Sequence, residues 1–198
     1  MEGMRRSQLQ EMLADGIFLA PDDECNALVQ RAPTLLDAFN ATPMSQMEQR
    51  IGILKRALIR YERGMMLSPV RWQFGHLDIG QGCFFNWDCL FLDNARITFG
   101  TRVAVGPKAQ FVTSGHPVRA VERARFGQDG NRILGAVCTS APIIVEDEVW
   151  IGAGVIVLPG VTIGARSVIG AGSVVNRSIP PDSLAVGNPC RVIRAIAN

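Results

Sequence analysis

Histidine is scarce in this sequence: only His76 and His116 occur among 198 residues. The five cysteines are widely spaced, with no CxxC pair and no zinc-knuckle spacing. Two imidazoles are too few for a zinc centre that needs three, so no metal site is predicted. We expect the cysteines to be free thiols in a reducing compartment.

Long apolar runs and an excess of one charge are missing too. No stretch approaches about 18 apolar residues free of charges and clustered glycines, so no transmembrane helix is predicted. The opening residues, MEGMRRSQLQEMLADG, have no apolar core long enough for a signal peptide. A net charge of +2 creates no strong field toward nucleic acid or a membrane. We therefore expect a cytoplasmic protein that binds neither.

The N-terminal part, residues 1–66, is predicted to be a small helical segment. The stretch SQLQEMLADG ends in a glycine stop at Gly16. Ser45 and Glu48 have the spacing of a capping box, and Gly64 would end the helix that they begin. Between them, apolar residues recur at helical spacing: Ile51, Leu54, Leu58 and Tyr61. The plainest interpretation is a packing segment with no chemistry of its own.

A strict six-residue period dominates residues 145–178. The first position of every unit is aliphatic and β-branched: Val145, Ile151, Val157, Ile163, Ile169 and Val175. Glycine recurs at the second or fourth position, where a sharp corner needs a positive φ. Each unit is one short strand and one tight turn, so three units make a triangular coil whose strands pair with those of the next coil.

The same six-residue period is less regular before residue 145, and it is lost in one stretch. Ile79, Phe85 and Phe91 are in frame, and after a two-residue slip the frame resumes at Phe99 and continues to Phe111. Between about 112 and 142 the period is lost, so this stretch is predicted to leave the coil as a loop. Residues 67–198 are accordingly predicted to be one β-helix domain with an excursion.

These motifs together resemble the maltose, galactoside and nodulation-type sugar O-acetyltransferases. The N-terminal stretches DAFNATP and MEQRIGILKRAL are similar to that family's small N-terminal domain, and FFNWDCLFLD to its aromatic-Asn segment. TSGHP resembles its His-Pro loop, and EVWIGAGVIVLPGVTIG with AVGNPCRVIRAI its C-terminal signature. The resemblance implies an all-β core, a left-handed parallel β-helix with a small helical N-terminal segment. It also implies acetyl-CoA as co-substrate, with no metal required, and a homotrimer whose sites lie between adjacent prisms.

The catalytic residues follow from this resemblance. His116 in TSGHP matches the family's general base, and an imidazole is well suited to take a proton near neutral pH. Asn86 matches the asparagine that orients the acceptor hydroxyl or holds the intermediate. The backbone N–H of Ala153, after the WIG turn, matches the oxyanion donor. His76 is interpreted as structural.

The resemblance also implies residues for acetyl-CoA. Trp150 would line the groove for the pantetheine chain, and Ala171 and Gly172 would let that chain approach the backbone. The remaining candidates lie near the C-terminus, where a local excess of arginine suits phosphate groups: Asn176, Arg177, Arg191 and Arg194.

The acceptor side is expected to use Gln73, Phe84, Asp93 and Asn94. Here the sequence departs from the family, because Gln73 stands where Asp or Ser is common and the loop after His116 is longer. An O-acetyltransferase for a sugar or sugar-like acceptor is the predicted function. Two alternatives stay open: an acyltransferase for a non-sugar acceptor, and a β-helix that serves as an inactive scaffold.

Overall fold

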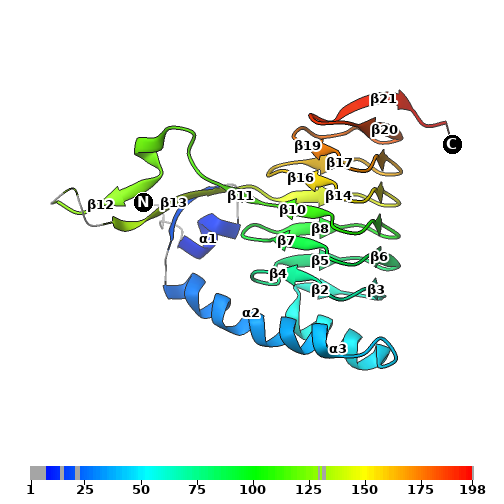
Figure 1. Cartoon of the computed structure of the whole chain (residues 1–198), viewed down its shortest axis with the longest axis horizontal. Helices are drawn as coiled ribbons and strands as arrows, with labels where there is room; N and C mark the ends of the chain where they lie inside the picture. The colour runs from blue at the N-terminus through cyan, green and yellow to red at the C-terminus, as the bar shows by residue number, and fades with distance from the viewer. Residues whose placement is uncertain (1–7, 14–15, 21–22, 129, 131–132, 198) are drawn as a thin grey trace, which may run out of the picture.

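The computed structural model describes residues 8–13, 16–20, 23–128, 130 and 133–197. Short parallel strands stack into a three-sided prism, with helices at one end and an arm projecting from its side (Figure 1). The chain visits the three faces in the same order on every coil. This is the β-helix that the six-residue period predicts.

Each face of the prism is one sheet, and we number the faces in the order in which the chain crosses them. Face 1 holds β2 (Arg60–Tyr61), β5 (Leu77–Ile79), β8 (Ile97–Phe99), β14 (Ile143–Val145) and β17 (Thr162–Ile163). Face 2 holds β3 (Gly64–Met66), β6 (Cys83–Phe85), β9 (Ala104–Val105), β15 (Trp150–Ile151), β18 (Val168–Ile169), β20 (Ser183–Val186) and β21 (Arg191–Ala195). Face 3 holds β4 (Arg71–Trp72), β7 (Leu90–Leu92), β10 (Gln110–Val112), β16 (Ile156–Val157) and β19 (Val174–Val175).

The first positions of the six-residue units form the core of the prism. All six, from Val145 to Val175, are fully buried. Lower in the stack the same positions carry aromatic rings: Phe99 makes edge-to-face contacts with Phe85 at 4.9 Å and with Phe111 at 5.0 Å between ring centroids. Aromatic pairs of this geometry add to the stabilisation from burial. The period therefore predicts the inside of the prism residue by residue.

The corners of the prism use positive φ, but glycine is only one way to reach it. Gly154 and Gly172 have φ of +65° and +71°. Equivalent corners place charged residues there, for example Asp88 at +62° and Lys108 at +59°. Such residues reach the left-handed region at some cost in strain.

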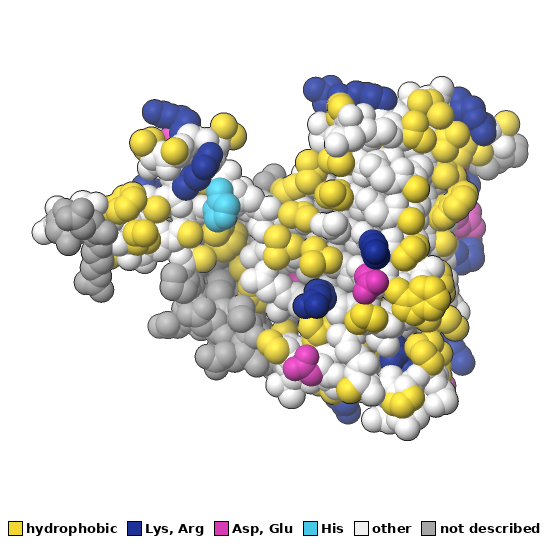
Figure 2. All heavy atoms as spheres, viewed as in Figure 1, with side chains coloured by type: hydrophobic (Ala, Val, Ile, Leu, Met, Phe, Trp, Pro, Cys, Tyr) yellow, Lys and Arg dark blue, Asp and Glu magenta, His cyan; other side chains and the backbone are white. Residues whose placement is uncertain are grey.

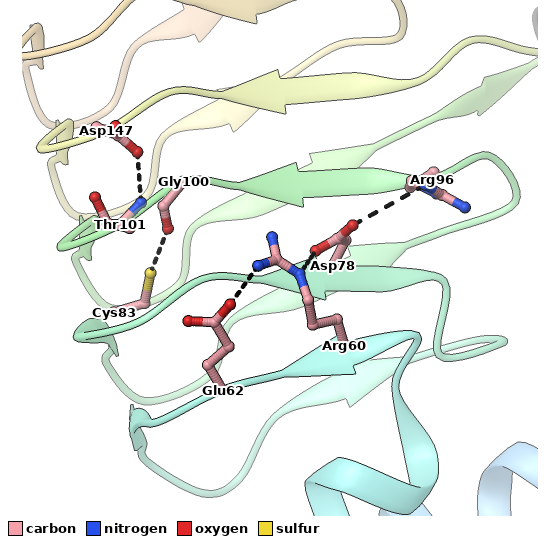
Figure 3. A network of polar contacts seen from close by, with 8 residues as sticks. All are labelled: Arg60, Glu62, Asp78, Cys83, Arg96, Gly100, Thr101 and Asp147. Atoms are coloured by element: carbon pink, nitrogen blue, oxygen red, sulfur yellow. Dashed lines mark hydrogen bonds and ion pairs between the residues drawn. The ribbon is translucent and has the colours of Figure 1, made fainter.

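Polar side chains link neighbouring coils along the outside of face 1 and the corner that follows it (Figure 3). Arg60 donates to Asp78, which also lies 4.0 Å from Arg96. At the next corner the N–H of Thr101 donates to the Asp147 carboxylate at 2.7 Å, and this bond lowers the pKa of Asp147. Exposed ion pairs contribute little stability, so these side chains give face 1 a charged outer surface while its backbone hydrogen bonds and buried residues hold the coils together.

The N-terminal segment is less helical than expected. Its helices are α1 (Gln8–Leu13), α2 (Asp23–Ala41) and α3 (Met47–Ala57), but β1 (Gly16–Ala20) lies between the first two. The capping-box prediction is wrong, because the N-cap is Gln46 and no side chain caps the helix. The predicted stop at Gly64 is wrong as well, since α3 ends at Ala57. The first parallel strand, β2, begins at Arg60, whereas the domain boundary was placed after residue 66.

Arg50 of α3 connects the helices to the prism. Its side chain is 1% exposed, and its guanidinium donates to the carbonyls of Phe39, Thr42 and Met66. The guanidinium also lies 4.0 Å from the centroid of the Phe39 ring. Burial lowers the pKa of Arg50. One buried cation therefore joins α2, α3 and the first coil.

The chain leaves the prism after β10 and rejoins it at β14. We call residues 113–142 the arm. Its elements are β11 (Ser114–Gly115), η1 (Ala120–Glu122), β12 (Ala124–Phe126) and β13 (Ile133–Ser140). The arm is more than a loop, because β13 pairs antiparallel with β11, with β12 and with β1 of the N-terminal segment. Two segments far apart in sequence thus build one small sheet beside the prism (Figure 1).

Candidate active site

A groove of about 500 Å³ runs along the corner between faces 2 and 3. The turns of four successive coils contribute to it, through Asn86, Pro107, Ala153 and Ala171. The turns are joined by hydrogen bonds, from Gly154 N–H to the Pro107 carbonyl and from Gly172 N–H to the Ala153 carbonyl, each of 2.8 Å. The result is a long, straight channel with a rigid floor of small residues.

Trp150 forms a wall of this groove. It lies on β15 and is 58% exposed, while its neighbour Ile151 is fully buried. Successive residues of a strand point to opposite sides, so the buried Ile151 directs Trp150 outward. Phe84 on β6 lines the groove in the same way. Both residues were expected at ligand sites, and the structure brings both to one groove.

Ala153 offers a hydrogen-bond donor at the middle of the groove. The flanking N–H groups of Gly152 and Gly154 donate to Ile169 and Pro107. Among the described residues, the N–H of Ala153 finds no acceptor. It lies in the groove wall and can donate to a ligand oxygen, as an oxyanion donor must.

Asn86 lies at one end of the groove. Its Oδ1 accepts a hydrogen bond from the N–H of Trp87 at 2.8 Å, and its own N–H donates to Val105 at 3.0 Å. The side-chain carbonyl is therefore occupied, and no described residue accepts from Nδ2. Asn86 presents a fixed N–H donor to the groove.

His116 follows β11 on the arm, where it is exposed. Its Nδ1 lies 2.8 Å from the carbonyl oxygen of Val137. A carbonyl can only accept, so Nδ1 carries the proton. In the neutral ring Nε2 then has the free lone pair, which is the state that a general base needs. No feature of the sequence singled out Val137, because it acts through its backbone.

The groove and His116 belong to different corners of the prism. The groove follows the corner between faces 2 and 3, and its lining residues all come from prism strands and their turns. The arm leaves from the corner between faces 3 and 1. Face 3 separates the two, so a single chain does not bring His116 to Asn86, Trp150 or Ala153. In Figure 2 the arm stands clear of the prism, with apolar side chains gathered on it.

Asp93 does not lie where a substrate contact was expected. Its carboxylate is fully buried and accepts four backbone N–H bonds of 2.6–3.0 Å, from residues 73–76. These bonds hold the turn between β4 and β5. The expected contact with substrate is corrected to a structural role, because every bond of the carboxylate is made within the chain.

Gln73 is the first residue of this turn, and Asn94 lies beside it. Asn94 is 8% exposed, with Nδ2 3.9 Å from the sulfur of Met12 in α1. Its Oδ1 and the Oε1 of Gln73 are buried, with no hydrogen-bond partner among the described residues. His76, interpreted as structural from the sequence, is buried with Nδ1 2.9 Å from the Asp93 carbonyl oxygen. Asn94 is therefore covered by the N-terminal segment rather than open to an acceptor, against the expectation.

The residues expected near the coenzyme phosphates are exposed on the last coil. Arg191 and Arg194 lie on β21, and Asn176 and Arg177 follow β19. Arg191 donates to the Oδ1 of Asn176 at 3.3 Å. Gly172 adjoins the groove at Ala171, and a side chain added to it would point into open space. Three arginines thus lie at the end of the prism toward which the groove runs.

The described residues contain no group of three or more His, Cys, Asp or Glu side chains arranged to hold a metal ion. None of the described helices is both long and apolar enough to cross a membrane.

Known proteins are similar in sequence to this chain along most of its length. A family model described as bacterial transferase hexapeptide (six repeats) matches residues 142–177. The galactoside O-acetyltransferase of Escherichia coli K12 is 36% identical over 179 residues, which are 88% of this chain and 83% of that protein. The chain belongs to the hexapeptide-repeat family of sugar O-acetyltransferases. Its membership confirms the resemblance read from TSGHP and the C-terminal motifs.

Solved structures of the family agree with the fold. A maltose O-acetyltransferase of Clostridium difficile 630 superposes with a TM-score of 0.88 at 35% identity, covering 98% of this chain and 99% of that one. A hexapeptide-repeat acetyltransferase of Vibrio cholerae, solved with acetyl-coenzyme A, superposes with a TM-score of 0.84 at 33% identity. That match covers 98% of this chain and 100% of the other.

Proposed function

We propose that this protein transfers the acetyl group of acetyl-CoA to a hydroxyl of a sugar or sugar-like acceptor. The observation that carries the proposal is the straight groove with a free N–H at Ala153, combined with an imidazole whose Nε2 is free on a projecting arm. Family relatives named for galactoside and maltose favour a sugar acceptor. The predicted cytoplasmic location stays a prediction.

The groove fits the thin chain and thioester of acetyl-CoA. Its floor is made of small corner residues, including Ala153 and Ala171, and Trp150 offers an apolar wall. A larger side chain at Ala171 would fill this channel, since Ala171 is exposed in it. Arg191 and Arg194 on the last coil supply positive charge for phosphates.

Acetyl-CoA supplies an activated acetyl group, and the residues of this chain do the rest. Nε2 of His116 would take the proton of the acceptor hydroxyl as its oxygen attacks the thioester carbonyl. The N–H of Ala153 would donate to the oxygen that becomes negative. The carbon–sulfur bond then breaks, and the imidazolium returns its proton to the departing thiolate. Positioned acid–base catalysis of this kind contributes about 10²–10⁴ in rate.

A second copy of the chain has to complete the site. His116 and the groove lie on different corners, so His116 of one subunit would meet the groove of its neighbour. The arm carries exposed apolar side chains suited to such a contact, including Val118 at 91% and Ile133 at 66% exposure. A repeated contact of one patch with a different patch closes into a ring when the rotation between subunits allows it, as the threefold rotation of a trimer does. We propose the homotrimer that the resemblance implies.

The test measures free thiol released from acetyl-CoA with a panel of sugars, amino sugars and small alcohols. His116→Ala should lower kcat by about 10²–10⁴. His116→Asn is the sharper variant, because its amide can still donate to Val137 but cannot act as a base. Circular dichroism verifies that both variants fold. Wild-type kcat in His116→Asn would show that the residue anchors the loop, and no turnover with any acceptor would favour the scaffold alternative.

A further inference from the structure

The loop that carries His116 is held by the side chain of Arg123. Its Nε donates to the carbonyl of Pro117 at 3.0 Å, and its Nη2 donates to the carbonyl of Val118 at 2.8 Å. These are the two residues that follow His116. Hydrogen bonds from a charged donor are stronger than those between neutral groups.

The backbone of Arg123 acts on His116 from the other side. Its carbonyl accepts from the N–H of Val137 at 2.9 Å, and the Val137 carbonyl accepts from Nδ1 of His116 at 2.8 Å. The hydrogen bonds form a closed ring: His116 bonds to Val137, Val137 to the backbone of Arg123, and the side chain of Arg123 to Pro117, which is covalently joined to His116. Arg123 is the residue that touches both halves of this ring.

We propose that Arg123 is the positioning residue that fixes the direction of Nε2 of His116. The inference rests on the proposed function and adds to it a residue that does not touch substrate. Without the guanidinium, the hydrogen bond to Val137 alone would hold the imidazole of His116. The carbonyls of Pro117 and Val118 would lose their donor, and the backbone after His116 could move. A displacement of about 1 Å in a reacting group can cost on the order of 10²-fold in rate.

The geometry of the guanidinium matters more than its charge. Arginine reaches two carbonyls at once with a rigid fork, whereas the ammonium of lysine is a single point. Arg123 is exposed, and the two carbonyls can bind water when it is lost. The stability of the fold should therefore change little while the rate changes strongly.

The inference is tested with Arg123→Gln and Arg123→Lys, and with Arg119→Gln as the matched control. Arg119 lies in the same exposed segment, but it pairs with Glu122 at 2.9 Å instead of the loop carbonyls. Both Arg123 variants should lose roughly 10- to 100-fold in kcat, with the KM for acetyl-CoA unchanged because the groove is untouched. The control should stay within about twofold of wild type. In a third variant, Arg123→Ala, added guanidinium should restore part of the activity, because it can again donate to the carbonyls of Pro117 and Val118.

Three results would overturn the inference: wild-type kcat in Arg123→Gln, an equal loss in Arg119→Gln, or a rise in KM without a fall in kcat. His116→Asn is assayed beside these variants. If His116→Asn is inactive while Arg123→Gln is fully active, the positioning role fails and the proposed function stands. If wild type turns over no acceptor, both fail together.

Discussion

The prism and the arm follow different physical rules. In the prism every coil repeats the same inward aliphatic or aromatic residue, and the next coil covers it. The arm has no such repeat, and its small antiparallel sheet leaves Phe126, Ile133 and Leu134 largely exposed. The prism buries its own core, whereas the arm leaves apolar surface exposed.

The prism therefore provides the stable framework, and the arm carries the imidazole that we propose as the base. The prism supplies a straight groove whose floor cannot shift, because each turn is bonded to the next. The arm carries an imidazole that one chain cannot bring to that groove. Catalytic residues on loops held by a rigid scaffold are a common arrangement, and in the oligomer that we propose the scaffold served by this loop belongs to a second copy.

The prism and the arm should differ most in the stability lost when one phenylalanine ring is removed from each. Phe99→Ala empties a fully buried position in contact with three aromatic rings and should cost about 3–5 kcal/mol of unfolding free energy. Phe126→Ala in the arm removes a ring that is 51% exposed and should cost about 1 kcal/mol or less. Thermal unfolding of both variants measures the difference. Equal losses would show that the arm has a core of its own.

The second largest loss of stability should come from the junction between the helices and the prism. Arg50→Met keeps the length of the side chain but leaves the buried carbonyls of Thr42 and Met66 without their donor. We expect a loss of roughly 2–3 kcal/mol in unfolding free energy. Arg56→Met, on the exposed side of the same helix, is the control. A stability unchanged by Arg50→Met would mean that apolar packing alone holds α3 to the prism.

The smallest effect concerns the one tyrosine of the chain, Tyr61 in the first coil. Burial raises its pKa to about 12, above the value near 10 of an exposed tyrosine. Because the folded pKa is the higher one, the stability from this group is complete below pH 10. It is lost as the pH rises toward 12.

Ultraviolet absorbance of tyrosinate reports this group alone, since the chain has no other tyrosine. The midpoint should lie near pH 12 in the native protein and near pH 10 in denaturant. A native midpoint near pH 10 would show that Tyr61 is in contact with water and that the first coil of the prism is open to solvent.

Much of the prism could be predicted from sequence because its rule is local. A strand and a corner every six residues identify which side chain points inward, from Val145 to Val175, without knowledge of any distant contact. Trp150, Phe84, Asn86 and Ala153 were expected at ligand sites from the family resemblance, and the structure brings them to one groove. Stacked coils bring equivalent turns to the same corner.

The arm and the N-terminal segment could not be predicted in this way. β1 pairs with β13 across more than a hundred residues, and no periodicity reports such a partner. GIFLA follows the predicted stop at Gly16, and five residues are too short for a period that would identify them as a strand. The burial of Asn94 was missed with the placement of the N-terminal segment, because α1 covers it. The burial of Asp93 has a different origin, since its carboxylate accepts from the backbone of the turn of residues 73–76. Arg123 escaped notice because it acts on backbone carbonyls.

The central claim is that His116 of one chain serves the groove of another. Subunit mixing tests it most directly, with His116→Ala in one chain and Ala171→Trp, which blocks the groove, in the other. Each variant should be inactive when it is the only chain present. Co-expressed with different tags and purified on both, the mixed trimers should regain about one third of wild-type activity, since a ring of either mixed composition has one contact in three that joins an intact arm to an intact groove. Mixed oligomers as inactive as the single variants would contradict the claim and place both halves of the site in one chain.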